Sequence, residues 1–299
     1  MKNNMALTRR RLLQGLGLGV GAAVIGGHFY LNDQGMDKAP KRNGKILLDM
    51  HNHLPKLDQP DLVRILSSHG ITGLSCINKE GNEQRLLFEE ALGLPGVRQI
   101  DNSLASIESH YGIGYILRDQ ELTGSQHHIL AVGVPGDYLN NDLDPRKAVE
   151  IIRGYNGASI INHPFVTPNR NPHLGPSYLR YRFLNGAELA VMRELIAMVD
   201  EVEIFNAHNI NPTFGLFGVP DMRQANEKAE DLATSSGRTG VVSSDGRRAE
   251  QIKLCGIYLD DPGKSICTRY IVDQIKAHKF ENDQRQYVSR LSFVRGMFL

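Results

Sequence analysis

Cysteine is scarce in this chain of 299 residues, which contains only Cys76, Cys255 and Cys267. No two of them form a Cys-x-x-Cys pair, and Cys76 and Cys255 lie in apolar, strand-like runs. Unpaired cysteines in such runs behave as small buried hydrophobic residues. The sequence therefore argues against a disulfide framework.

Excess charge of either sign is also missing, because 34 basic and 33 acidic residues give a formal net charge of +1. Without its first 35 residues the chain has 30 basic and 32 acidic residues, a net charge of −2. Domains that bind nucleic acid usually present a basic surface. We therefore expect no nucleic acid among the partners. With 41% apolar and 22% charged residues, the composition is that of one large globular domain.

The N-terminal segment, residues 1–35, differs from the rest of the chain. Thr8-Arg9-Arg10-Arg11-Leu12-Leu13-Gln14 precedes a Gly-rich, uncharged stretch that ends at Leu31. This segment resembles a twin-arginine export signal. The resemblance implies the twin-arginine translocation machinery as a partner and the periplasm or cell envelope of a bacterium as the location. A transmembrane anchor is the alternative, because the stretch is about 20 residues long. No clear Ala-x-Ala cleavage site follows, so a membrane tether through this segment stays open.

Residues 36–44 are polar and contain Pro and Gly, which indicates a linker before a domain at residues 45–299. In that domain, apolar strand-like runs alternate with helix-like segments about seven times. The spacing predicts helices over 144–155, with Asp144 as N-cap, and from Pro220 to near Gly237. This alternation predicts an α/β fold with a parallel sheet. No Gly-x-Gly-x-x-Gly follows the first strand, so a TIM-like barrel is favoured over a dinucleotide-binding fold. The predicted strands cover 46–49, 72–77, 114–117, 129–134, 158–161, 201–205, 240–243 and 254–259.

The first predicted strand ends in Asp49-Met50-His51-Asn52-His53. Side chains alternate along a strand, so His51 and His53 point the same way and can bind one metal ion at about 2.0 to 2.1 Å. In a barrel, functional residues follow the strands. Residues of the metal-binding type stand at nearly every predicted strand end: His51, His53, Asp58, Asn78, Lys79, Glu80, Glu121, His128, His163, Glu203, Asn206 and Asp245.

This order of residues resembles the polymerase-and-histidinol-phosphatase (PHP) domain, a distorted seven-stranded β/α barrel of metal-dependent phosphoesterases. Asp49, His51, His53 and Asp58 are similar to its opening motif, Asp-x-His-x-His-x-x-x-x-Asp. The resemblance extends from about residue 45 to residue 280. Three further segments match in order: Glu121 with His128, His163-Pro164, and Ser244-Asp245. The resemblance implies that His51, His53, Glu121 and Asp245 bind a first metal and that Glu121 bridges to another. It further implies that His128 is a metal ligand, and that Asp58 and His163 contribute ligands to a larger metal cluster.

Two departures from that pattern replace histidine with a cation. Ile77-Asn78-Lys79 stands where the family has Thr-Asp-His, and Asp245-Gly246-Arg247 stands in place of Asp-x-His. Protonated Lys and Arg cannot ligate a metal. We therefore expect one divalent ion, of manganese, iron or zinc, and leave a second or third open. Lys79 and Arg247 are predicted to bind the phosphate and stabilise the transition state. The alternative is that they pair with Asp58 and Glu80 in a degenerate site.

Several candidates have a second interpretation. Asp58 precedes Pro60 and an apolar run, so it is either a ligand or a helix N-cap. His163 contacts metal or substrate, or is a buried histidine bonded to backbone. Glu203 is either functional or a support for a ligand. His127 alternates to the other face and is not expected to be a ligand.

Three classes of function compete: an exported phosphoesterase that hydrolyses a small-molecule phosphate ester, a metallohydrolase of another bond such as an amide, and a ligand-binding protein without turnover. The sequence favours the first. Arg170 and Arg180, in the long segment 167–182 after the His-Pro motif, are candidate substrate-binding residues, unless that segment is a solvated loop.

Overall fold

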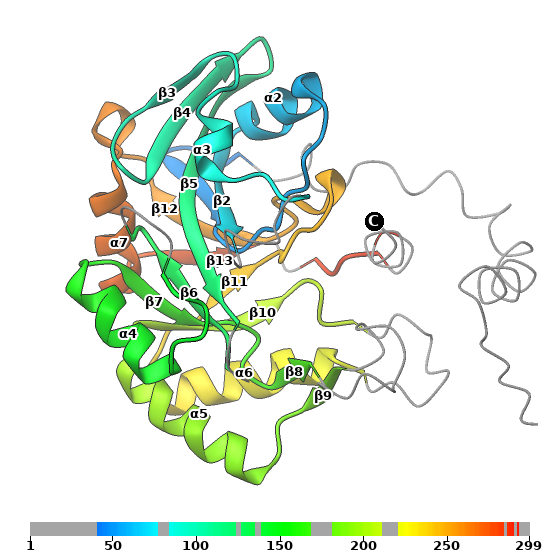
Figure 1. Ribbon diagram of the computed structural model, residues 1–299, viewed down its shortest axis with the longest axis vertical. Coiled ribbons are helices and arrows are strands. Elements are labelled where there is room, and N and C mark those ends of the chain that lie inside the picture. The colour runs from blue at the N-terminus through cyan, green and yellow to red at the C-terminus, as the bar shows by residue number, and fades with distance from the viewer. Residues whose placement is uncertain are drawn as a thin grey trace, which may run out of the picture.

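The computed structural model describes residues 41–76, 84–123, 127–134, 139–168, 181–210, 221–283, 286–289 and 292. Figure 1 shows the arrangement of the elements. The strands are β1 (Lys45–Asp49), β2 (Gly70–Cys76), β3 (Val97–Gln99), β4 (Leu104–Ser109), β5 (Gly112–Leu122), β6 (Ile129–Val132), β7 (Ala158–Ile161), β8 (Val166–Pro168), β9 (Tyr181–Phe183), β10 (Glu201–Asn206), β11 (Val241–Ser243), β12 (Gly256–Asp260) and β13 (Glu281–Asp283). The helices are α2 (Gln59–Ser67), α3 (Phe88–Ala91), α4 (Pro145–Gly154), α5 (Gly186–Met198), α6 (Arg223–Ser235) and α7 (Thr268–Lys276), with short 3₁₀ helices at Ala249–Gln251 and Gly263–Ser265.

The main sheet has eleven strands and nearly closes into a barrel. Its path is β11-β10-β7-β6-β5-β2-β1-β12-β13, and β4 joins β3 to β5 outside this path. At the seam, Asn282 in β13 donates its Nδ2 to the carbonyl of Gly240, just before β11, at 2.8 Å. The barrel-like α/β fold is therefore confirmed, but the expected count of seven strands is wrong. Short strands such as β3, two of whose three residues are exposed, offer no apolar run that the sequence could reveal.

The sheet is mixed, not parallel as the sequence predicted. β1, β2 and β5 run parallel, β6 is antiparallel to both β5 and β7, and β7, β10 and β11 again run parallel. The carboxyl ends of β1, β5, β7 and β11 therefore meet the amino end of β6 at one mouth of the barrel. This direction explains why His128 precedes its strand, while Glu121 lies near the carboxyl end of β5 and the other candidate ligands of the mouth follow their strands.

Helices cover the outside of the sheet, with α4, α5 and α6 at one end and α2 and α3 at the other (Figure 1). Asp144 caps α4 as predicted, accepting from the backbone N–H of Arg146 at 2.9 Å. Buried apolar residues form one large cluster between the strands and α4, α5 and α7, and a second beneath α2 and α3. In the described part of the chain, no helix has the length and apolar character to cross a bilayer. The predicted export signal at residues 1–35 lies outside the described residues.

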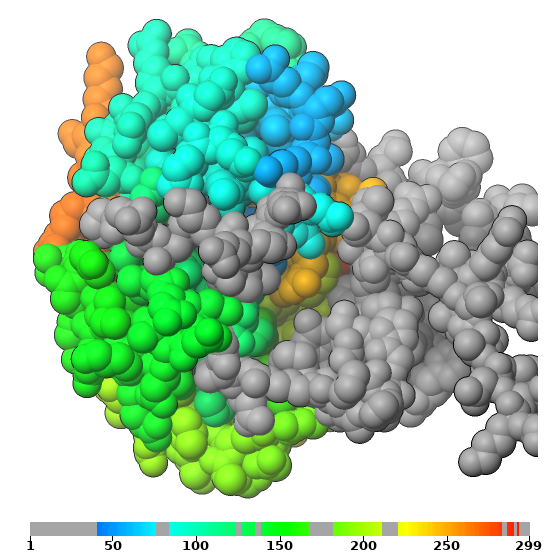
Figure 2. Space-filling view, in the orientation of Figure 1, coloured from blue at the N-terminus to red at the C-terminus, as the bar shows by residue number. Residues whose placement is uncertain are grey.

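Segments far apart in the sequence meet at the surface near the barrel mouth. In Figure 2 the cyan chain that begins at residue 84 lies beside the orange-yellow chain between β11 and β12. The two are joined by a hydrogen bond between residues 162 positions apart, from the Arg85 guanidinium to the Arg247 carbonyl at 3.4 Å.

Candidate metal centre

His51 and His53 directly follow β1 and are buried, with 0% and 2% of their surface exposed. The Nδ1 of His53 lies 2.9 Å from the carbonyl oxygen of Ser75, and the Nδ1 of His51 lies 3.0 Å from Oε1 of Glu203. Both oxygens accept hydrogen bonds, so each ring carries its proton on Nδ1. In the neutral ring of each histidine the lone pair is therefore on Nε2, the nitrogen that faces the centre of the site.

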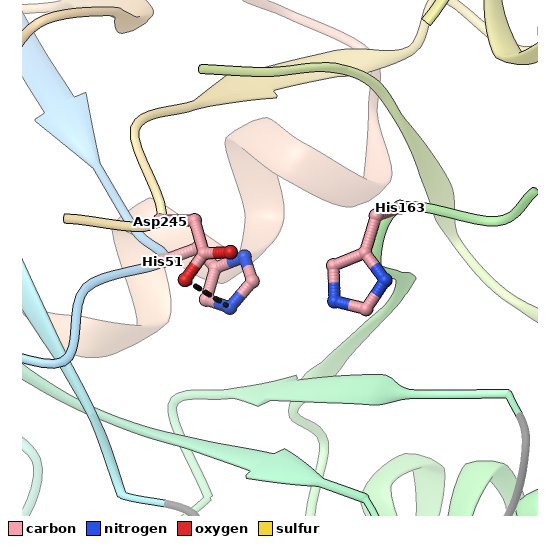
Figure 3. Close-up of side chains that lie close together, drawn as sticks. All are labelled: His51, His163 and Asp245. Atoms are coloured by element: carbon pink, nitrogen blue, oxygen red, sulfur yellow. Dashed lines mark ion pairs between the residues drawn. The ribbon is translucent and has the colours of Figure 1, made fainter. Parts of the chain in front are cut away.

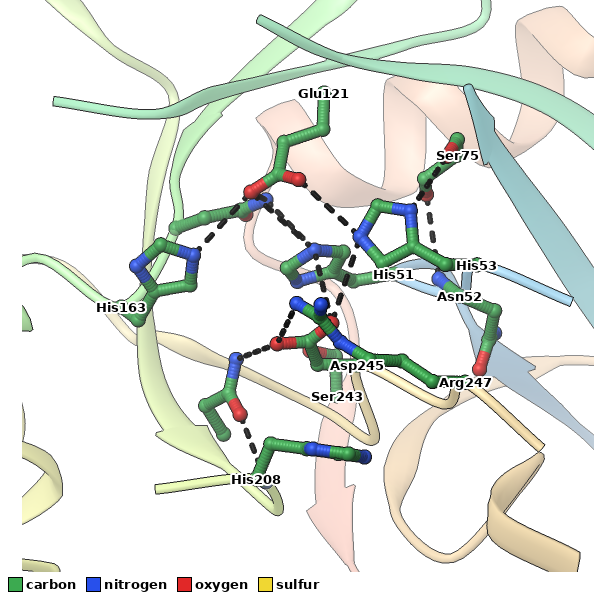
Figure 4. Close-up of polar contacts among 12 residues, drawn as sticks. His51, Asn52, His53, Ser75, Glu121, His163, His208, Ser243, Asp245 and Arg247 are labelled. Carbon is green, nitrogen blue, oxygen red and sulfur yellow. Dashed lines mark hydrogen bonds and ion pairs between the residues drawn. The ribbon is translucent and has the colours of Figure 1, made fainter. Parts of the chain in front are cut away.

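Two carboxylates face these nitrogens across the barrel mouth (Figure 4). The Nε2 of His53 lies 3.2 Å from Oε2 of Glu121 and 3.4 Å from Oδ1 of Asp245. The Nε2 of His51 lies 3.5 Å and 3.7 Å from Oε1 of Glu121 and Oδ1 of Asp245. The four residues that the PHP resemblance assigned to a first metal are thus together in space.

Two more histidines converge on Glu121. The Nδ1 of His128 and the Nε2 of His163 lie 2.9 Å and 3.2 Å from its Oε1. His163 also approaches His51 and Asp245 from the end of β7 (Figure 3). Ligand atoms within 4.8 Å of one another form three overlapping groups: His51 with His163 and Asp245, His51 with His53 and Glu121, and Glu121 with His128 and His163. Because Glu121 belongs to two of these groups, its position suits the bridging role that the resemblance implies.

Backbone conformation helps to aim two of these side chains. His163 and Asp245 both have positive φ values, 27° and 48°, a region that non-glycine residues seldom adopt and that is enriched at functional sites. One carboxylate oxygen of Glu203 accepts a hydrogen bond from the backbone N–H of His163 at 2.6 Å, and the other accepts one from Nδ1 of His51. Of the two roles left open for Glu203, support of the ligands is the one that these contacts show.

Asp49 holds the loop that carries Asp245 through bonds to the preceding residue, Ser244. Its carboxylate accepts from the backbone N–H of Ser244 at 3.0 Å, the hydroxyl of Ser244 at 2.5 Å and the backbone N–H of Lys253 at 2.7 Å. Burial raises the pKa of Asp49 to about 6, although these bonds counteract the rise. The opening aspartate of the motif therefore joins the end of β1 to the loop after β11.

The charges of the cluster are mutually dependent. Burial alone would lower the pKa of His51, but Asp245, Glu121 and Glu203 hold it well above its ordinary value. Burial likewise tends to raise the pKa of Glu121, but His51 and His128 hold it well below its ordinary range. Without a metal, a proton on His51 thus serves as the counter-charge of the carboxylates. A divalent ion would take that place, with release of the proton.

The residues present fit a divalent metal ion. The Nε2 of His53 is buried and has no hydrogen-bond partner, yet it faces two carboxylates. An orphaned buried acceptor is costly unless a ligand satisfies it. Imidazole nitrogens together with carboxylate oxygens suit manganese, iron and zinc. Such a buried cluster at a barrel mouth fits a metal-dependent hydrolase.

The remaining predicted residues differ in where they lie. Asp58 is exposed and caps α2, accepting from the backbone N–H of Asp61 at 3.2 Å, so the cap is the role that the structure shows. Arg247 contacts Oδ1 and Oδ2 of Asp245 at 3.2 and 3.4 Å, so it pairs with a candidate ligand and not with Asp58. His127 belongs to none of the three ligand groups among the described residues. Lys79, Arg170 and Arg180 lie outside the described residues, as do Asn78 and Glu80.

Sequence reasoning missed two residues beside the cluster. His208, which matched no motif, follows β10 with its Nε2 2.9 Å from Oε1 of Gln251. Burial lowers its pKa to about 4, against the charge of Asp245. Arg85 donates to the carbonyl of His53 at 2.5 Å. His208 stands two residues after Asn206 at a strand end, a signal that could have found it, whereas nothing around Arg85 in the sequence marks it.

Fold and site together define a barrel-like α/β protein with a buried histidine and carboxylate centre. No family model matches the chain, and no curated protein matches it. Among solved structures, PsfC from Pseudomonas syringae aligns with a TM-score of 0.52 at 13% identity, over 85% of this chain and 96% of PsfC. This likeness shows a shared fold.

Two further structures align with TM-scores below 0.5. One is a two-domain protein from Bacteroides vulgatus containing a predicted PHP-like metal-dependent phosphoesterase, with a TM-score of 0.47, 12% identity and coverage of 87% of this chain and 72% of that one. The other is the lesion-specific endonuclease EndoQ from Pyrococcus furiosus, with a TM-score of 0.46, 12% identity and coverage of 80% and 57%.

Proposed function

We propose that this protein is an exported, metal-dependent phosphoesterase that hydrolyses a small-molecule phosphate ester. The observation that carries the proposal is the convergence of Nε2 of His51, Nε2 of His53 and the carboxylates of Glu121 and Asp245 at one barrel mouth. The order of these residues along the chain matches the PHP motifs. Export rests on the segment from Thr8 to Gln14 alone.

Six residues of the site would bind metal ions. His51, His53, Glu121 and Asp245 would hold one divalent ion, while His128 and His163 would hold a second with Glu121 shared between the two. When bound, such ions supply Lewis acidity toward a phosphoryl oxygen and toward the attacking water.

The residues around the ligands would keep the site ordered. Glu203 and Ser75 hold the two Nδ1 protons, which fixes the ring orientation and leaves Nε2 as the donor atom.

Arg247 would bind the phosphate at the rim of this cluster. Its side chain is 31% exposed, and its NH2 lies 3.2 Å from Oδ1 of Asp245. A planar guanidinium can contact two phosphate oxygens and stabilise negative charge that develops on them. Lys79 is proposed for the same role on the strength of the sequence.

The same ion pair favours a second function, ligand binding without turnover. The Arg247 guanidinium pairs with the carboxylate of Asp245, one of the ligands proposed for the first ion. This ion pair could exclude a metal from the first site. In that case the barrel would bind an anion through arginine and would not hydrolyse it. The two functions predict different effects of removing Arg247. Turnover should fall if the protein is a phosphoesterase, and metal content should rise if it is a binding protein without turnover.

The test combines elemental analysis of protein purified without chelator with a screen of phosphate esters and cyclic amides. We expect at least one equivalent of metal, which the double variant His51→Ala, His53→Ala loses, and hydrolysis of a phosphate ester. Arg247→Ala should lower turnover about 30- to 1000-fold, since a contact to developing phosphoryl charge is worth about 2 to 4 kcal/mol. Its metal content and melting temperature should stay near those of the wild type.

The matched control is Arg248→Ala, at the neighbouring residue, whose side chain pairs with Glu250 at 2.7 Å. Full metal content in the double histidine variant would contradict the proposed centre. A rise in metal content in Arg247→Ala, with no hydrolysis by either protein, would support binding without turnover. Cleavage of amides and not of esters would assign the hydrolase to another bond.

A further inference from the structure

Arg85 lies between the two loops that carry the candidate metal site. Its chain runs antiparallel to the segment after His53, with Leu86 N–H donating to Leu54 O at 2.8 Å and Lys56 N–H donating to Gln84 O at 2.9 Å. From there its NH1 donates to the carbonyl of His53 at 2.5 Å and to that of Arg247 at 3.4 Å. One guanidinium thus bridges the loop after β1 and the loop after β11.

This arginine is half-buried, and no carboxylate of the described residues forms an ion pair with it. Its two hydrogen bonds to residues that the structure describes use one nitrogen, NH1, and both partners are neutral carbonyls. The charges of Arg247 and Asp245 both act on Arg85 in this partly buried place, and a further anion beside the two arginines would be attracted by both of them.

We propose that Arg85 and Arg247 together form a binding site for a doubly charged terminal phosphate, so that the substrate is a phosphate monoester and not a diester. This inference rests on the proposed function and adds the substrate class. Arg85 is a residue of the substrate site that the PHP motifs do not include. It would act by direct contact with phosphate oxygens through the guanidinium nitrogens other than NH1.

The charge of the site favours a dianion. Three buried carboxylates, Glu121, Glu203 and Asp245, contact the candidate ligand histidines, and Asp245 also pairs with Arg247. Counted with Asp49, the carboxylates exceed the two arginines by two charges, so one divalent ion would balance the site and a second would make it net positive. A terminal phosphate carries close to two negative charges near neutral pH and presents three acceptor oxygens. A diester carries one charge and two such oxygens, so it gains less from a second arginine.

The experiment compares Arg85→Gln and Arg85→Lys with the wild type, each loaded with metal. We would measure kcat and KM for para-nitrophenyl phosphate and bis(para-nitrophenyl) phosphate, inhibition by inorganic phosphate, and metal content. Arg85→Gln should raise KM for the monoester and the inhibition constant of phosphate about 10- to 100-fold, the size expected for a hydrogen bond to a charged group. The diester should change less than about threefold, and metal content should not change. Arg85→Lys should recover part of the loss, because it keeps the charge.

Arg248→Gln serves as the control for loss of an arginine beside the same loop, since Arg248 pairs with Glu250. An equal loss on both esters, or a loss of metal with unchanged phosphate inhibition, would overturn the proposal and leave Arg85 as a support for His53. If the wild type hydrolyses neither these two esters nor any ester of the screen described above, the proposed function fails, and phosphate binding measured by calorimetry then decides about Arg85. Binding that Arg85→Gln weakens would support the anion site, and no phosphate binding by the wild type would overturn it.

Discussion

Lys253 is a buried cation whose removal should stabilise the protein in a pH-dependent way. It is 0% exposed, and its Nζ donates to the carbonyl of Ser68 at 2.9 Å and to the hydroxyl of Ser68 at 2.8 Å. Burial lowers its pKa from an ordinary 10.5 to about 7, although the charge of Asp49 counteracts this. Since one pKa unit corresponds to about 1.4 kcal/mol, the protonated lysine costs the fold about 5 kcal/mol at low pH.

The sign follows from the two pKa values. Below pH 7 the lysine is protonated in both folded and unfolded chains, so the full cost is present. Between pH 7 and 10.5 the folded state binds fewer protons than the unfolded state, so stability rises with pH. Above 10.5 the lysine is neutral in both states, and the cost is gone.

We expect Lys253→Met to be more stable than the wild type by about 2 to 4 kcal/mol at pH 7. This allows about 1 to 3 kcal/mol for the lost bonds to Ser68. The advantage should shrink by about 1.4 kcal/mol per pH unit and fall by about 2 to 3 kcal/mol between pH 7.5 and 9.5. Among the titratable neighbours, Asp49 has a pKa of about 6, and burial lowers the pKa of His69 from its ordinary value, so neither is expected to change protonation within this window.

Denaturant unfolding of the metal-free proteins at pH 7.5, 8.5 and 9.5 gives the difference in unfolding free energy directly. Lys264→Met, at an exposed lysine, is the matched control for removal of a lysine charge. A stability difference between Lys253→Met and wild type that does not vary with pH would refute the reasoning, because it would mean that Lys253 titrates alike in both states.

Two further predictions concern the ligand support and the export signal. Glu203→Gln should weaken metal binding about 10- to 100-fold in a competition assay, because the carboxylate that holds the Nδ1 proton of His51 is lost; unchanged affinity would contradict its supporting role. Arg9→Lys with Arg10→Lys should block delivery of the full-length chain to the envelope, judged by cell fractionation, and normal delivery would remove the twin-arginine assignment.

The polar end of β5, which the sequence prediction left out, shows where apolar periodicity fails as a signal for a strand. The prediction for β5 stopped at Leu117, because Arg118-Asp119-Gln120-Glu121 reads as a polar break. In the structure β5 continues to Leu122, and Asp119, Gln120 and Glu121 are all buried. Polar residues that face a functional barrel mouth break the apolar pattern while they remain in the sheet.

The helix and strand predictions that are confirmed depend on local sequence features. Asp144 caps α4 through a bond to a residue two positions away, and β7 occupies 158–161 as predicted. The prediction of a parallel sheet failed, because the direction of β6 depends on pairing with two strands on either side and not on its own residues. Strand direction and neighbour order are properties of the whole sheet.

The sequence by itself determined the identity and order of the candidate ligand residues, since a histidine or carboxylate at the end of a strand is visible wherever the strand lies. Only the tertiary structure decided that Glu121 meets four histidines, that Asp49 anchors Ser244 and that Arg85 lies beside Arg247. Ser244 is 195 positions from Asp49, and Arg247 is 162 from Arg85. Contacts over such separations are fixed by closure of the barrel, which aligns strand ends according to their pairing and not according to their distance along the chain.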